Sequence, residues 1–184
     1  MSKAHTRALV LGTAAELFYK EGFRAIGVDT ICAASGVGKM TLYRHFESKD
    51  DLILAYLGEV NARFWSMFDE VTSGAETARE KILAFFAALG ELANHPACHG
   101  CPFLNLVVDF PAMEHPGHAL ALAHKRAVRD RFLALVVQAG LPDPEARADG
   151  LFLLMDGAYM AIRLHGSGGP AARVREAAEL LLGA

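Results

Sequence analysis

The sequence predicts an all-α protein of about nine helices, in which a three-helix head is followed by a larger helical body. Apolar residues recur at intervals of three and four, as in the stretches 9–18 and 52–57, and this spacing places them on one face of a helix. Glycine and proline separate the periodic stretches. Almost no stretch alternates apolar and polar residues in the way that a half-buried strand does.

Start and stop signals set the expected helix boundaries. Gly22 closes the first helix, and Ser48 gives the fourth a hydroxyl cap, with Asp50 and Asp51 in the first turn. A glycine-rich stretch at 166–170 separates the last two helices. The helices are expected over residues 4–21, 28–35, 39–46, 48–71, 75–94, 101–110, 117–139, 143–166 and 169–182.

The composition favours a folded protein whose apolar surface is partly covered by a partner. Hydrophobic residues make up 53% and charged residues 21% of the chain, and the mean hydropathy is +0.24, which is apolar for a soluble protein. No uncharged apolar run reaches the roughly 18 residues of a membrane span, and the N-terminal stretch does not resemble a signal peptide. Three cysteines suit a reducing cytoplasm better than a disulfide framework. We therefore expect a cytoplasmic protein that does not contact a membrane.

Charge is divided unevenly along the chain. The net charge is −3, yet residues 1–50 carry +2 and the remainder carries −5. A basic head on an acidic body is the arrangement expected when the head meets the phosphates of a nucleic acid.

A helix-turn-helix is predicted over residues 28–46. Two short helices flank Gly36, where a tight turn requires a positive φ that glycine adopts without a steric clash. The residues expected to pack inward are Ile31, Val37, Leu42 and Phe46.

The remaining face of the second short helix is polar or long and is free to enter a major groove. By spacing alone, an ordinary helical hairpin with a solvated face is an equal alternative. A phosphate-binding loop at 36–41 is excluded, because the motif requires Ser or Thr directly after the lysine and Met40 stands there. The expected groove-facing residues are Lys39, Met40, Thr41, Tyr43 and Arg44, with His45 and Lys49 where phosphates would pass.

Several separated motifs recur in the order found in one family of regulators. They are Ala14–Phe23, Val28–Ile31, Ser35–Val37, Thr41–Phe46 and Ser48–Asp50. Across about residues 7–57 the chain resembles the DNA-binding domain of TetR-family transcriptional regulators. The resemblance implies a homodimeric repressor that leaves its DNA operator when a small molecule enters the C-terminal domain. It also implies a DNA-binding domain over residues 1–47 and a ligand-sensing and dimerisation domain over residues 48–184.

The resemblance also assigns roles to the residues of the recognition face. It makes Thr41, Tyr43 and His45 DNA contacts and places Lys49 on a phosphate. One departure concerns the start of the helix at Val28, where the family often has a hydroxyl residue that contacts phosphate and this chain has Gly27. The positions that would choose the operator sequence are Lys39, Met40 and Arg44.

The body carries many aromatic and methionine side chains that suit a pocket for an apolar or aromatic effector. Taken singly, each of them is more readily explained as part of the core. Asn105 and Asp109 stand out, because they lie within an apolar run, and they either contact ligand or cap neighbouring backbone. The candidate ligand residues are Trp65, Phe68, Phe86, Phe103, Asn105, Asp109, Met113, Met155 and Tyr159.

A second cluster of residues would let the same kind of regulator respond to a metal ion or to the redox state instead of an organic effector. Cys98 and Cys101, with His99 between them, permit a metal site or a redox switch, although no second pair stands at zinc-finger spacing. The plainer alternative is a small buried thiol at the start of a helix. We expect no cofactor. A helical enzyme is a weaker rival, because the sequence carries no nucleophile elbow, zinc-protease motif or dinucleotide fingerprint.

The last two helices carry apolar stripes with small residues, as expected for a four-helix dimer interface. A twofold dimer requires a roughly palindromic operator whose half-sites lie about one helical turn, or a multiple of it, apart. The helix that begins at Ser48 joins head to body, so we expect a ligand in the body to act through it. The candidate interface residues are Leu151, Leu154, Ala158, Ala161, Ile162, Val174, Ala178 and Leu181.

Overall fold

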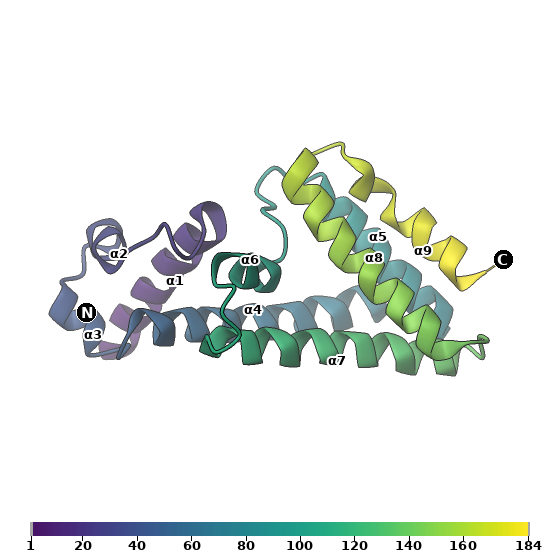
Figure 1. Ribbon diagram of the computed structural model, residues 1–184, viewed down its shortest axis with the longest axis horizontal. Coiled ribbons are helices and arrows are strands. Elements are labelled where there is room, and N and C mark those ends of the chain that lie inside the picture. Colours follow the sequence, from purple (N-terminus) through teal and green to yellow (C-terminus); the bar gives the residue numbers. More distant parts are fainter. Residues whose placement is uncertain (1, 184) are drawn as a thin grey trace. The chain divides into compact units, whose positions relative to one another are not determined.

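The computed structural model describes residues 2–183 and confirms the all-α prediction. Within that range it contains nine α-helices, one short 3-10 helix and no strand (Figure 1). The elements are α1 (Lys3–Glu21), α2 (Val28–Ser35), α3 (Lys39–Tyr43), α4 (Lys49–Thr72), α5 (Ala78–Ala93), α6 (Pro102–Asp109), α7 (Pro116–Gln138), α8 (Pro144–His165), η1 (Pro170–Arg173) and α9 (Val174–Leu182).

Each predicted helix is present, with three differences in extent. The fifth helix begins at Ala78 rather than at residue 75, because Thr77 caps it there with a capping box. The third helix ends at Tyr43, although hydrogen bonds from the next three amides to Met40 and Leu42 continue the turn to Phe46. The segment 169–182 is not one helix but η1 followed by α9. The tight turn of η1 lies against Gly90 of α5, where a Cβ atom would stand 3.2 Å from the carbonyl oxygen of Ala172. Glycine at this position permits the close approach.

The chain forms two compact units. The first combines the chain up to Ala62 with Pro102–Leu122, and the second combines Arg63–Cys101 with the chain from Ala123 onward. Helices α4 and α7 each contribute residues to both units. Helix α6 therefore belongs to the same unit as α1–α3, although residues 44–101 separate it from α3 in sequence. The division into domains at residue 48 stays a prediction.

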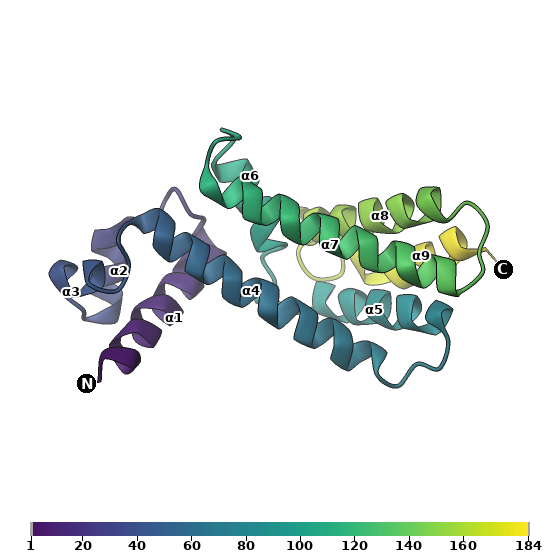
Figure 2. The same cartoon turned by 90° about the horizontal axis from the view of Figure 1, so that it is seen from below.

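The first unit is built around an aromatic cluster. Figure 2 shows α1, α2 and α3 gathered beside the first turns of α4. Phe23, which follows the end of α1, is buried and packs 5.3 Å from Phe18 and 6.0 Å from Tyr56, measured between ring centroids. Burying each phenylalanine contributes roughly 1.5–3 kcal/mol, so this cluster fixes α1 on α4.

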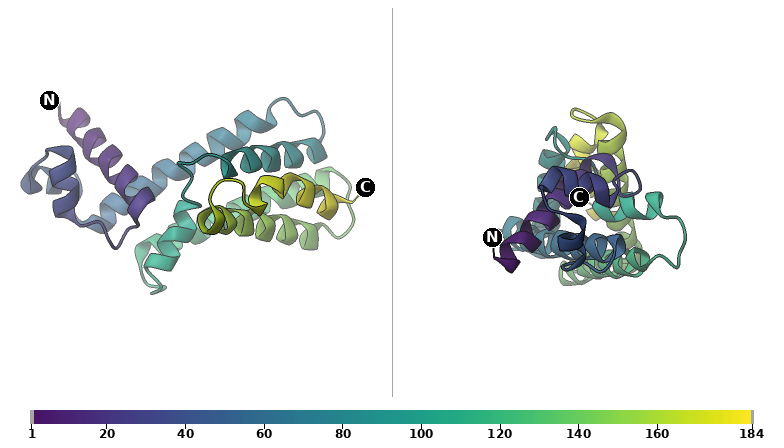
Figure 3. Two further views of the ribbon diagram at one scale, coloured as in Figure 1. Left: turned by 90° about the horizontal axis from the view of Figure 1, so that it is seen from above. Right: turned by 90° about the vertical axis from the view of Figure 1, so that its left-hand side faces the viewer.

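The second unit is built on α5, α8 and α9, which lie side by side (Figures 1 and 3). Phe85 and Phe86 of α5 and Phe132 of α7 form its aromatic core, in which Phe86 and Phe132 stack with ring centroids 5.7 Å apart. Arg79 holds the end of α9 by donating hydrogen bonds to the carbonyl oxygens of Leu182 and Gly183. No helix among residues 2–183 combines the length and apolarity needed to cross a membrane.

Candidate DNA-binding surface and ligand pocket

Residues 28–46 fold as the predicted helix-turn-helix. Helix α2 ends at Gly36, whose φ of +68° confirms the positive φ expected of this turn. The four residues expected to face inward are all buried: Ile31, Val37, Leu42 and Phe46. Their packing fixes α3 against α2 and leaves the opposite face of α3 toward solvent.

The predicted recognition residues lie on that outward face. Met40 is 81% and Tyr43 is 45% exposed, and Lys39 and Arg44 are also exposed. Thr41 and His45 are partly buried. An apolar side chain as exposed as Met40 has no role in the core of this unit, so the surface is available for a partner.

The cations of this face are held by neighbouring polar groups. The ammonium of Lys39 lies 2.5 Å from the carboxylate of Asp29 on α2, and this hydrogen bond raises the pKa of Lys39. The guanidinium of Arg44 donates to the hydroxyl of Thr41 at 3.1 Å. The ammonium of Lys39 has three hydrogens and can keep this exposed carboxylate partner while it donates to a further acceptor.

Gly27 is the N-cap of α2 and, as expected, provides no side-chain capping bond. A serine or threonine there would accept a hydrogen bond from the first turn. Helix α2 therefore begins without the local bond that usually fixes such a start.

Lys49 and Asp109 both bind the backbone at Phe23. Lys49 donates from its ammonium to the carbonyl oxygen of Phe23 at 2.6 Å. Asp109 accepts from the amide N–H of Phe23 at 2.6 Å and from that of Arg24 at 3.3 Å. Of the two roles that the sequence leaves open for Asp109, the structure thus shows backbone capping. Burial lowers the pKa of Lys49, against the opposing charges of Asp50 and Asp109.

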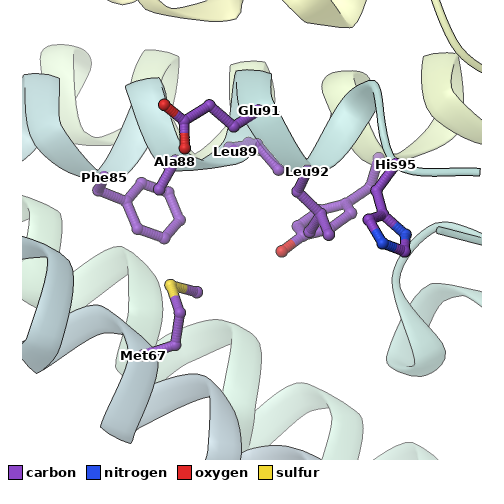
Figure 4. Close-up of a pocket in the computed structure, with 8 residues that line it drawn as sticks. Met67, Phe85, Ala88, Leu89, Glu91, Leu92 and His95 are labelled. Carbon is purple, nitrogen blue, oxygen red and sulfur yellow. The ribbon is translucent and has the colours of Figure 1, made fainter. Parts of the chain in front are cut away.

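An apolar cavity of about 350 Å³ lies in the second unit, within the size range of small-molecule sites. Figure 4 shows Phe85 of α5 pointing toward Met67 of α4, with Leu92 facing the same space. Its lining consists of Met67, Phe85, Ala88, Leu89, Glu91, Leu92, His95 and Tyr159.

Of the predicted ligand residues, Tyr159 lines this cavity and the others lie elsewhere. Phe86 and Met155 are buried in the core of the second unit, and the ring of Trp65 lies beneath the guanidinium of Arg131. Phe68 is buried too, and it lines a second, more polar cavity. In the first unit, Phe103 and Asn105 are buried, Met113 is 72% exposed, and Asp109 caps backbone.

Most of the residues that line this cavity were not among the predicted ligand residues. Phe85, Ala88, Leu89 and Leu92 recur at intervals of three and four along α5, and this stripe is the signal that marks one face of the helix. The stripe alone does not distinguish a packed core from a cavity, because that depends on side chains of other helices. A second cavity of about 430 Å³, with Lys81, Arg131 and Ala134 in its lining, is more polar.

The cysteine cluster does not form a donor set for a metal. Cys98 and Cys101 are buried, and residues 2–183 hold no group of three His, Cys, Asp or Glu side chains that could share a metal ion. The carbonyl of His99 accepts a hydrogen bond from Arg163. A redox response of the two thiols stays a prediction.

The apolar stripes predicted for dimerisation are largely buried within the chain itself. Leu151, Ala158, Ile162, Val174 and Ala178 are buried within the second unit, where α8 packs on α9 and both pack on α5, and so they present little surface to a partner.

Part of the apolar surface of α8 and α9 remains uncovered. Its most exposed members are Leu153, Leu164 and Leu180, at 67%, 80% and 83%. A groove of about 330 Å³ between α8, η1 and α9 is lined in part by four of the predicted interface residues, Leu154, Ala158, Ala161 and Val174. Leu181 is 36% exposed.

Two family models match the chain in the order of its helices. Residues 10–56 match the description "Bacterial regulatory proteins, tetR family", and residues 78–178 match "Tetracyclin repressor-like, C-terminal domain". The chain belongs to the TetR family. A helix-turn-helix that binds DNA and an all-α fold are therefore established for this TetR-family regulator, and the members of this family are transcriptional regulators rather than enzymes.

Solved structures and curated relatives agree with this assignment. A TetR-family regulator from Streptomyces coelicolor is 34% identical with a TM-score of 0.88, over 97% of this chain and 93% of its own. A TetR regulator from Chloroflexus aurantiacus is 27% identical with a TM-score of 0.81, over 98% and 93%. The transcriptional regulator UidR of Escherichia coli K12 is 28% identical over 70% of this chain, and this match spans 63% of the length of UidR.

His124 should make the stability of the second unit depend on pH. It is buried at right angles to the ring of Phe64, with centroids 4.8 Å apart, and burial followed by the charge of Lys125 lowers its pKa from 6.5 to about 4. The folded state thus prefers neutral His124. The stability this contributes is complete above pH 6.5 and is lost as the pH falls toward 4.

We expect acidification from pH 7 to 5 to lower the free energy of unfolding of the second unit more in the wild type than in His124→Gln. The difference has a limit of about 1.4 kcal/mol for each pH unit in the window. Urea unfolding followed by the fluorescence of Trp65, the single tryptophan, measures it. Carboxylates titrate in both proteins, so an equal pH dependence in the two would contradict the assignment to His124.

Proposed function

We propose that this TetR-family protein is a ligand-responsive repressor, whose dimer binds a palindromic operator and is released by a small apolar or aromatic effector. The observation that carries the proposal is the outward face of α3. Its long and charged side chains are exposed, while the residues beneath them are buried in the helix-turn-helix. A recognition helix needs this combination of a fixed backbone and free side chains.

Each exposed residue of α3 offers a distinct contact with DNA. Arg44 can donate two parallel hydrogen bonds to a guanine, and Met40 can pack on the methyl group of a thymine. Tyr43, Thr41 and His45 supply groups for the phosphate backbone. Lys49 gives one of its three ammonium hydrogens to Phe23 and retains two for a phosphate.

Arg44→Ala tests the recognition face. We expect the variant to lose about 1–3 kcal/mol of binding free energy for the preferred operator and to discriminate less at one base pair of each half-site, because a base contact disappears. Tyr43→Ala should instead weaken binding to all sequences alike. In vitro selection from random duplexes, followed by titration at fixed salt, measures both effects. The matched control is Arg126→Ala, an exposed arginine of α7, and wild-type preference in Arg44→Ala would remove the assigned role.

The exposed apolar surface of α8 and α9 supports the dimer. Large apolar side chains that remain exposed beside an apolar groove mark a surface that a partner covers. A second copy of the chain would present the same surface, and a twofold axis would bring two α3 helices to successive half-sites.

Leu153→Glu tests this interface. We expect a charge at this position to shift the protein from dimer to monomer at micromolar concentration and to weaken binding to a palindromic duplex more than to a single half-site. Light scattering after size exclusion measures the first effect. The control is Val137→Glu, where a comparably exposed apolar side chain belongs to a different helix, α7. Dimers of Leu153→Glu as stable as the wild type would place the interface elsewhere.

The apolar cavity of the second unit is the proposed effector site. Its lining is contributed by α4, α5, α8 and the segment after α5, and the polar groups of Glu91, His95 and Tyr159 stand among apolar neighbours. A flat or branched apolar molecule with a group that bonds a phenol would match this lining. Met67 belongs to α4, whose first residue is Lys49, so an effector against Met67 acts on the same helix that binds the turn at Phe23.

Ala88→Phe tests the effector site by filling it. Compounds found by thermal-shift screening of apolar aliphatic and aromatic molecules should stabilise the wild type and lose that effect in Ala88→Phe, while operator binding without ligand persists. Ala134→Phe makes the same change in the more polar cavity and serves as the control. Loss of the thermal shift in Ala134→Phe instead would move the site to that second cavity.

The direction of regulation is proposed as repression, which is typical of the family. The curated relative FasR of Mycolicibacterium smegmatis, named as an activator, is 45% identical over only 51 residues, or 28% of this chain. In vitro transcription from a promoter that overlaps the selected operator decides between the two directions. We propose the cytoplasm as the location, because a bacterial operator lies there.

A further inference from the structure

Phe23 is held at three points, by its ring and by both polar groups of its backbone. The ring is buried in the aromatic cluster of the first unit. The amide N–H donates to Asp109 of α6, and the carbonyl oxygen accepts from Lys49 of α4. The residue therefore ties three helices together at the turn that leads from α1 toward α2.

The peptide group between Phe23 and Arg24 lies between two opposite charges. Its carbonyl oxygen accepts from the ammonium of Lys49, while its N–H donates to the carboxylate of Asp109. Both charges favour the same orientation of the peptide dipole, and hydrogen bonds to charged groups are stronger than neutral ones. The two side chains thus act together on one peptide plane.

The residue before Phe23 is adapted to the carboxylate. Gly22 has a φ of +94°, and a Cβ atom there would stand 3.0 Å from a carboxylate oxygen of Asp109. On the other side, the guanidinium of Arg24 lies 6.0 Å from the ring centroid of Phe110, the residue after α6. The end of α6 therefore contacts three consecutive residues of the turn, Gly22, Phe23 and Arg24.

We propose that Asp109 is a positioning residue for DNA binding, through which α6 sets the orientation of the helix-turn-helix. The turn ends at Gly27, whose missing side chain leaves the start of α2 without a local capping bond. Asp109 instead fixes the other end of the turn, by accepting hydrogen bonds from the amides of Phe23 and Arg24. Because α2 carries α3, a loose turn lets the recognition face sample many orientations and lowers the fraction competent to bind.

The effect of Asp109 on operator binding rests on the proposed recognition of DNA by α3, whereas the hydrogen bond from Phe23 to Asp109 does not. Two measurements therefore test the hydrogen bond and its effect on DNA binding separately. Hydrogen exchange of the amides of Phe23 and Arg24 in the full-length protein, followed by NMR, reports the bond without DNA. Titration with a palindromic duplex selected from random DNA by the wild-type protein reports its effect on binding.

The variants are Asp109→Ala, which removes the acceptor, and Asp109→Asn, whose side-chain oxygen can still accept an N–H. Glu114→Ala removes an exposed carboxylate from the neighbouring segment and is the control. We expect at least about tenfold faster exchange at Phe23 and about tenfold weaker duplex binding in Asp109→Ala. Exchange in α5 and α8 should be unchanged, and Asp109→Asn should recover most of both losses.

Two results would overturn the proposal. The first is Asp109→Ala binding the selected duplex as tightly as the wild type while the amide of Phe23 exchanges faster. The second is equal loss of binding in Asp109→Ala and Asp109→Asn with faster exchange throughout the first unit, which identifies a general loss of stability. If the wild type selects no duplex, the proposed function fails, and the hydrogen-exchange result still decides whether Asp109 holds the turn.

Discussion

The DNA-binding surface depends on the burial of apolar residues beneath a helix that is too short to persist alone. Helix α3 has five residues, whereas isolated helices shorter than about 12 residues are marginal in water. Leu42 and Phe46 are buried against the rest of the head, together with Ile31 of α2. This packing supplies the rigidity that α3 lacks, so the outward side chains can be chosen for contact with DNA rather than for stability.

Local signals in the sequence were sufficient for the helices and for the turn at Gly36, since periodicity and backbone preference are properties of neighbouring residues. They were insufficient where partners are far apart. Asp109 bonds an amide 86 positions away, which no spacing reveals. The stripe containing Leu151 and Ala158 was identified as apolar, but periodicity does not tell burial within one chain from burial between two. The cavity, likewise, was missed because it depends on several helices at once.

Two cations of the recognition face have intramolecular partners in the absence of DNA. The ammonium of Lys39 contacts the carboxylate of Asp29, and the guanidinium of Arg44 donates to the neutral hydroxyl of Thr41. The ion pair of Lys39 is exposed, so it contributes little to stability. Both cations retain further N–H donors. In the proposed complex with DNA, these remaining donors are the groups that meet a phosphate or a base edge.

Release by an effector requires that the molecule prefer one state of the protein, and α4 is the element on which that preference can act. The helix is continuous from Lys49, which bonds the turn at Phe23, to the turn that carries Met67 at the cavity. A ligand that fits both states equally shifts nothing, however tightly it binds. A shift from about 1% to 99% of the incompetent state needs roughly 5.5 kcal/mol of differential binding. In the proposed mechanism, displacement of Met67 or Phe85 contributes to this difference by changing the buried apolar area, and contacts with Glu91, His95 or Tyr159 can add to it.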